Sequence, residues 1–160
     1  HADKISVLLY TQTPDRLFLQ SIFNAKKSDL SIKAIDEVLA YFTNIREVYD
    51  VEVTFIGMLP PILYGPKLLK HTQALAPQLN DAISINAMNL TLYVDQVFED
   101  KAAEKNFNYV SKINAFELSF PKDLMIKNQL SYSDNRHISR AGEIEFGRRL
   151  IKYLNTGNVL

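Results

Sequence analysis

Short apolar runs alternate with a long amphipathic stretch in the first third of the chain, and this order limits the folds open to it. Residues Ile5–Tyr10 form a run typical of a strand buried on both faces, and Val51–Ile56 form a second strand-like run. Between them, apolar residues from Ser31 to Tyr49 recur with the spacing of one helix face. Strand, helix and strand in this order predict a βαβ unit, and hence a parallel sheet covered by helices on both faces.

The same alternation continues toward the C-terminus. A third strand is predicted over Asn108–Ile113 and a brief extended piece over Leu130–Ser133, and Ser139 is a suitable N-cap for a last helix. The second helix is expected to bury Leu90, Tyr93, Val94, Val97, Phe98 and Ala102, and the last helix Ala141, Ile144, Gly147, Ile151 and Leu154. We expect the aromatic residues Phe18, Phe23, Tyr41 and Phe42 to lie in the core.

Composition excludes several classes of function. The 160 residues are 47% apolar, which is enough for one domain over residues 1–160 with its own core. Lys and Arg number 18, as do Asp and Glu, so no net charge favours nucleic acid as a partner. The lack of cysteine excludes disulfides, thiolate metal sites and a cysteine nucleophile. The longest apolar stretch, Val53 to Leu63, is too short to span a bilayer.

The residues with recognisable chemistry are Asp134 and His137, in a loop that leads into the last predicted helix. At this spacing the carboxylate can contact one imidazole nitrogen and fix the tautomer, while the other nitrogen takes a proton from a serine hydroxyl. Gly142 would allow the first turn of the helix to pack closely against the sheet. Two candidate ligands without a third make a poor metal site, so we expect neither a metal nor a cofactor.

The block from Tyr132 to Gly142, YSDNRHISRAG, resembles the Asp-x-x-His-Leu-Ser-x-x-Gly signature that closes the SGNH (GDSL-like) hydrolase fold. Asp134, His137, Ser139 and Gly142 match this signature position by position. The chain looks in particular like the SGNH domains fused to the C-terminus of bacterial membrane acyltransferases of the acyltransferase-3 family. This resemblance implies a flavodoxin-like, three-layer α/β/α fold with Asp134 and His137 as catalytic acid and base.

Two features of SGNH domains are absent from the sequence. The Gly-Asp-Ser block that carries their nucleophile after the first strand does not occur, and Thr11-Gln-Thr13 lacks the Gly-x-Asn of the oxyanion hole. We therefore expect the chain to be the C-terminal part of a larger protein, with the first strand and the serine outside it. Preceding residues or a second copy in a swapped arrangement would supply them, because without that strand its neighbours would expose unpaired edges.

The resemblance implies an O-acyltransferase or esterase domain that acts on cell-envelope carbohydrate. Its partners would be an acyl donor, a carbohydrate acceptor and a membrane acyltransferase domain in the same polypeptide. Its location would be periplasmic or extracytoplasmic, tethered to the inner membrane. The serine mechanism requires neither metal nor diffusible cofactor.

Other interpretations of the same sequence remain open. A non-catalytic domain of this fold could bind glycan or a protein partner, and a flavodoxin-like regulatory domain is a further alternative, although no Gly-rich phosphate loop follows either leading strand. His71 is most simply a surface residue. Tyr64-Gly-Pro66 is either a turn or a loop that lines the substrate site.

Overall fold

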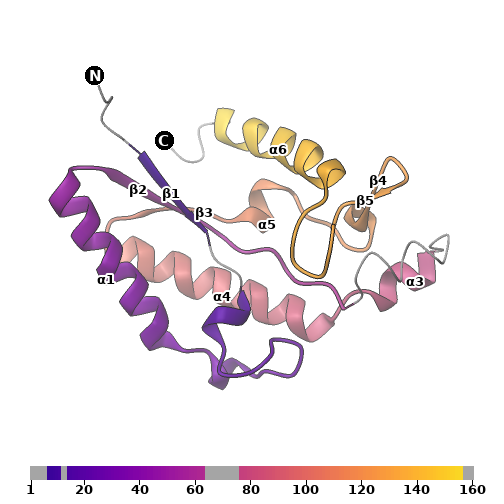
Figure 1. The fold of residues 1–160 in the computed structure, drawn as a ribbon, viewed down its shortest axis with the longest axis horizontal. Coiled ribbons are helices and arrows are strands. Elements are labelled where there is room, and N and C mark those ends of the chain that lie inside the picture. Colours follow the sequence, from indigo (N-terminus) through magenta and orange to yellow (C-terminus); the bar gives the residue numbers. More distant parts are fainter. Residues whose placement is uncertain (1–6, 12–13, 64–75, 157–160) are drawn as a thin grey trace.

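The computed structural model describes residues 7–11, 14–63 and 76–156 (Figure 1), so Tyr64–Pro66 and His71 lie outside the described residues. The helices and strands follow in the order β1 (Val7–Thr11), α1 (Ile32–Tyr49), β2 (Glu52–Ile56), α3 (Ala76–Asp81), α4 (Ile85–Glu104), β3 (Asn108–Val110), α5 (Lys112–Ala115), β4 (Met125–Ile126), β5 (Gln129–Leu130) and α6 (Arg140–Asn155). Short 3-10 turns occupy Pro14–Leu17, Lys27–Asp29 and Lys122–Leu124. In this part of the chain, no helix has the length and apolar character needed to cross a membrane.

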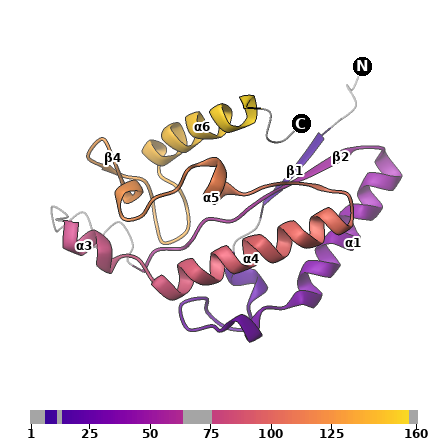
Figure 2. The same ribbon diagram turned by 180° about the vertical axis from the view of Figure 1, so that it is seen from behind.

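The main sheet has the order β1-β2-β3, and both pairings are parallel, with Leu8 opposite Val53 and Phe55 opposite Tyr109. Helices α1 and α4 lie on one side of this sheet, and α5 and α6 lie on the other (Figures 1 and 2). The predicted α/β class and the three-layer arrangement with a parallel sheet are therefore confirmed. Among the described strands, β1 pairs with β2 alone, so its other edge has no partner there.

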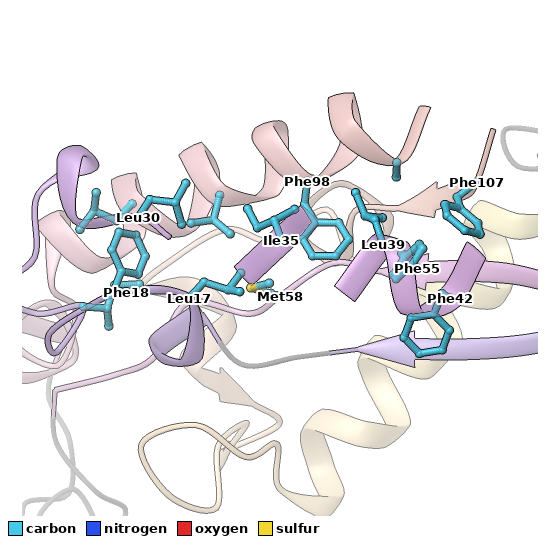
Figure 3. Packing of buried hydrophobic residues seen from close by; sticks show 14 of the residues in the cluster. Leu17, Phe18, Leu30, Ile35, Leu39, Phe42, Phe55, Met58, Phe98 and Phe107 are labelled. Atoms are coloured by element: carbon cyan, nitrogen blue, oxygen red, sulfur yellow. The ribbon is translucent and has the colours of Figure 1, made fainter. Parts of the chain in front are cut away.

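The core between the sheet and helices α1 and α4 is built around Phe55 (Figure 3). Its ring lies 5.4 Å from that of Phe42 on α1 and 5.2 Å from that of Phe98 on α4, centroid to centroid. Because rings of this size remove a large apolar area from water, each contributes about 1.5–3 kcal/mol to the free energy of unfolding. The predicted inner residues of the second helix lie here, with Leu90, Val94, Phe98 and Ala102 buried and Tyr93 and Val97 partly buried.

Two predictions about burial near this core are wrong. Strand β1 is not buried on both faces, because Leu9 is 62% exposed on the side away from α1, where no described element covers the edge strand. Tyr41 is also 62% exposed, since it points outward from α1, and its ring meets that of Phe42 in an edge-to-face arrangement. Phe18 and Phe42 are buried as expected, and Phe23 is partly buried against the same cluster.

The predicted inward face of the last helix is also wrong. Ile144 and Ile151 on α6 are 61% and 62% exposed, whereas Phe146 is fully buried. The helix carries two apolar stripes, and the one that packs inward presents Phe146 to Phe116, with the rings stacked 5.1 Å apart. An aromatic stack of this kind removes a large apolar area from water, which favours this rotation of α6.

The third predicted strand is shorter than expected. It ends at Val110, and Ser111 caps the short helix α5 by accepting a hydrogen bond from the amide of Asn114. At the other predicted cap, Ser139 accepts from the amide of Gly142 at the start of α6, as expected.

Gly142 lies in the first turn of α6 and packs against the backbone of Ser131, not against the main sheet as predicted. A Cβ at this position would overlap the carbonyl oxygen of Ser131 and the side chain of Ile138. Backbone atoms cannot move aside as the end of a flexible side chain can, so this contact fixes how closely the helix approaches the preceding loop. Gly147, on the same helix, would meet nothing within 4 Å.

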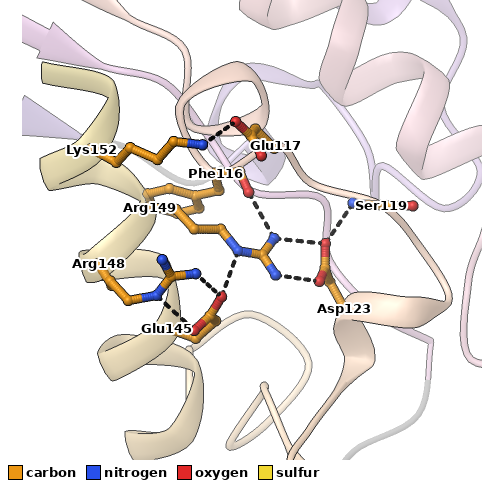
Figure 4. A network of polar contacts seen from close by, with 8 residues as sticks. All are labelled: Phe116, Glu117, Ser119, Asp123, Glu145, Arg148, Arg149 and Lys152. Atoms are coloured by element: carbon orange, nitrogen blue, oxygen red, sulfur yellow. Dashed lines mark hydrogen bonds and ion pairs between the residues drawn. The ribbon is translucent and has the colours of Figure 1, made fainter. Parts of the chain in front are cut away.

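The C-terminal half of α6 is tied to the loop after α5 by Arg149 (Figure 4). Its guanidinium donates to both oxygens of the buried Asp123, at 2.8 and 3.0 Å, and to the carbonyl oxygen of Phe116 at 2.8 Å. Asp123 also accepts from the amide of Ser119 at 2.7 Å. Both oxygens of this buried carboxylate are therefore paired, and removal of the arginine would leave its charge uncompensated.

We expect Arg149→Met to lower the free energy of unfolding by about 3 kcal/mol, because it strands the buried charge of Asp123. Arg148→Met is the matched control, because Arg148 on the same helix pairs with Glu145 while its side chain is 64% exposed. The loss of this exposed pair should lower the free energy of unfolding by less than about 0.5 kcal/mol. Urea unfolding of both variants measures the difference, and equal losses would contradict a special role for the Asp123 pair.

A second pair of variants tests the close approach of α6 to Ser131. Gly142→Ala should cost about 1–3 kcal/mol through overlap with the Ser131 backbone. Gly147→Ala should leave stability unchanged or raise it by about 0.5–1 kcal/mol, because alanine favours the helix and meets no neighbour there. The midpoints of chemical unfolding compare the two, and a tolerated Gly142→Ala would show that the helix can move away.

Candidate active site

The loop from Ser131 to Ser139 is closed by hydrogen bonds between its two ends. The amide of Ser139 donates to the carbonyl oxygen of Ser131 at 2.8 Å, and the amide of Ser133 donates to that of His137 at 2.8 Å. Tyr132 and Ile138 form an isolated antiparallel bridge between them. The loop therefore has the backbone pairing of a small hairpin, which presents residues 134–137 at its tip.

The loop is also anchored to the segment that follows β2. The hydroxyl of the buried Tyr132 donates to the carbonyl oxygen of Pro60 at 2.9 Å, and the amide of Ile62 donates to the carbonyl oxygen of Asn135 at 2.9 Å. At the base of the hairpin, the Ser139 hydroxyl donates to the carbonyl oxygen of Leu130. The hairpin is thereby held at its tip and at its base.

Asp134 and His137 meet at the tip of this hairpin. Nδ1 of the imidazole lies 2.6 Å from Oδ2 of the carboxylate, while Oδ1 accepts from the backbone amides of Arg136 and His137 at 2.7 and 2.8 Å. The carboxylate is therefore fixed by the backbone and presents its second oxygen to the ring. The side chain of Asp134 is 53% exposed and that of His137 is 74% exposed, so the outer edge of the imidazole is open.

The pKa of the Asp134 carboxyl reflects these contacts. Partial burial acts to raise it, but the hydrogen bonds from the two backbone amides and from His137 outweigh that effect and lower the pKa to about 2. Asp134 is consequently ionised near neutral pH. An ionised carboxylate on Nδ1 holds the proton at that nitrogen, which leaves Nε2 as the proton acceptor.

The serine hydroxyls nearest in sequence are engaged elsewhere. Ser133 donates to the backbone carbonyls of His137 and Ile138, and Ser139 to that of Leu130. Within the described residues, no serine hydroxyl hydrogen-bonds to the ring of His137. Nor do those residues contain a group of three or more His, Asp or Glu side chains placed to hold a metal ion.

A second polar group lies at the carboxyl end of the main sheet and was missed by the sequence analysis. Asp95 of α4 is 6% exposed and accepts from the hydroxyls of Tyr109 and Ser111 at 2.5 Å each. It fits only because residue 57 is glycine, since a Cβ there would overlap the Asp95 carboxylate. The one signal available in the sequence was a carboxylate next to Val94 on a helix face expected to be buried.

The same end of the sheet carries Lys112, whose Nζ donates to the hydroxyl of Thr11 at 2.8 Å. Thr11 ends β1 and Lys112 follows β3, so this contact reaches across the end of β2, which lies between them. A small recess of about 10 Å³ lies beside Gly57, lined by Tyr10, Phe55, Met58, Phe98 and Tyr109 among others. This recess is mainly apolar and shares Tyr109 with the polar group around Asp95.

Comparison with known proteins finds a likeness among solved structures. No protein-family model matches the sequence, and no curated protein matches it. Among solved structures, the chain is similar to the periplasmic domain of a lipopolysaccharide acetyltransferase from Salmonella ser. Paratyphi A, with a TM-score of 0.65 and 16% sequence identity. The match covers 94% of this chain and 57% of that chain. At this identity the likeness shows a shared fold.

Proposed function

We propose that the chain is part of an O-acyltransferase or carbohydrate esterase that acts on cell-envelope carbohydrate through a serine, His137 and Asp134. The observation that carries the proposal is the 2.6 Å contact between Asp134 and Nδ1 of His137, at a hairpin tip where the rest of the ring is open. The fold shared with a lipopolysaccharide acetyltransferase domain supports the choice of acyl transfer to a sugar.

The proposed reaction proceeds in two steps. Nε2 of His137 takes the proton of the serine hydroxyl as its oxygen attacks the acyl carbonyl, and the imidazolium then protonates the leaving group of the donor. A sugar hydroxyl next gives its proton to Nε2 and attacks the seryl ester, and the proton returns to the serine as it leaves. Asp134 orients the ring and stabilises the imidazolium in both steps. Water in place of the sugar would make the same site an esterase.

The serine of this proposal lies outside the 160 residues. The edge of β1 that no described strand pairs with offers a position for the strand that precedes this serine. A further strand added there in parallel would end at the same sheet edge as Thr11. A residue directly after that strand would then stand at the carboxyl edge, where open parallel sheets bind ligands. The exposed Leu9 on β1 and Ile144 and Ile151 on α6 offer apolar surface for a following helix.

For the proposed setting, the likeness to a periplasmic domain supports the location. We infer a periplasmic or extracytoplasmic domain, joined in one polypeptide to a membrane acyltransferase domain that delivers the acyl group. A donor of that group and a carbohydrate acceptor would be its partners.

A non-catalytic domain that binds glycan is the second candidate. It is favoured by one observation, namely that no described serine hydroxyl contacts the ring of His137. The two candidates differ in whether loss of the imidazole changes a rate.

We expect His137→Ala in the intact protein to reduce p-nitrophenyl acetate turnover by about 10²–10⁴-fold, because the general base is lost. Arg140→Ala is the control, since its side chain is 84% exposed close by and pairs only with Glu143 among the described residues. Turnover should be unchanged in that variant. Equal rates for His137→Ala and the unaltered protein would reject the acyl-transfer proposal and leave the binding domain.

A further inference from the structure

The acyl-transfer proposal gives no role to the ammonium group of Lys112 at the carboxyl edge of the sheet. Its side chain is half-buried, and burial lowers the pKa of the ammonium, with the charge of Asp95 acting in the opposite direction. A cation held away from bulk water is normally matched by an anion, because the loss of hydration must be offset.

The protein does not supply that anion within the described residues. Among those residues, the ammonium group of Lys112 forms no ion pair, and its only hydrogen bond is to the neutral hydroxyl of Thr11. Asp95 is the carboxylate that influences it, yet both Asp95 oxygens already accept from hydroxyls, those of Tyr109 and Ser111. An ammonium group has three N–H donors, so two remain for a ligand.

The position of Lys112 also suits a ligand site. It follows β3, and its contact with Thr11 at the end of β1 places the charge over the carboxyl ends of the three parallel strands. Ligands of open parallel α/β sheets bind at this edge. The partial burial of Lys112 keeps some water away from its side chain, and a charge contact gains strength where water is excluded.

We propose that Lys112 and Thr11 form an anion-binding subsite, which holds a carboxylate or phosphate group of the substrate at the carboxyl edge of the sheet. The ammonium contributes the charge and two donors, and the Thr11 hydroxyl fixes its direction. The inference that this anionic group belongs to a carbohydrate acceptor rests on the proposed acyl-transfer function. The inference that the subsite binds an anion does not depend on that function.

The direct test measures how fast Lys112 is labelled by an amine-reactive reagent in the intact, unaltered protein, followed by peptide mass spectrometry. Inorganic phosphate and glucuronate are the probes, glucose is the neutral control, and ionic strength is held constant with sodium chloride. Lys33 is the internal control, because its side chain is 86% exposed on α1. We expect an anion to slow labelling of Lys112 but not of Lys33.

Protection by phosphate alone would identify a phosphate-bearing substrate, and protection by glucuronate alone a uronic acid; both outcomes support the subsite. Unchanged labelling of Lys112, or equal protection of Lys33, would overturn it. Because this measurement needs no variant, a misfolded mutant cannot obscure the result.

A kinetic test connects the subsite to the reaction. Lys112→Met should raise the KM for an anionic carbohydrate acceptor by about 10–100-fold, the value of one charge-assisted hydrogen bond. Lys33→Met should leave this KM unchanged. An unchanged KM for the anionic acceptor would overturn the assignment to substrate. If labelling shows protection while His137→Ala retains full activity, the anion site stands and the acyl-transfer proposal fails.

Discussion

The hydrogen-bonded closure of the hairpin between Ser131 and Ser139 is the constraint on which the candidate site depends. Its two ends are joined by backbone bonds, and Gly142 brings the first turn of α6 into contact with Ser131. These contacts order the backbone of the tip, so the contact between Asp134 and the imidazole of His137 costs little further backbone entropy. The precision of the pair is thus a property of the loop backbone.

The hairpin is in turn fixed relative to the rest of the molecule from two directions. Tyr132 connects it to Pro60 after β2, and α6 is held at its far end by the Arg149–Asp123 ion pair. An ion pair at this buried position costs desolvation, but each oxygen of Asp123 has a donor and the geometry is bidentate. Such a pair also specifies one rotation of α6, which an apolar contact alone would define less sharply.

The polar groups at the hairpin and at the carboxyl edge of the sheet differ in how their charges are balanced. At the hairpin, the Asp134 carboxylate is stabilised by local backbone amides and remains open to solvent. At the carboxyl edge of the sheet, Asp95 is buried and satisfied by two hydroxyls, whereas the ammonium of Lys112 has only a neutral partner among the described residues. The first arrangement suits proton transfer, and the second suits recognition of an anion.

The sequence by itself determined the features that depend on neighbours along the chain. Strand–helix alternation predicted the parallel three-layer fold, and Asp134 and His137 were recognisable because only two residues of one loop separate them. Ser139 was identifiable as a cap for the same reason. Only the tertiary structure decided which stripe of α6 faces inward, that Leu9 and Tyr41 are exposed, and that Lys112 meets Thr11. Those outcomes depend on contacts between segments distant in sequence, whose packing no local pattern of residues specifies.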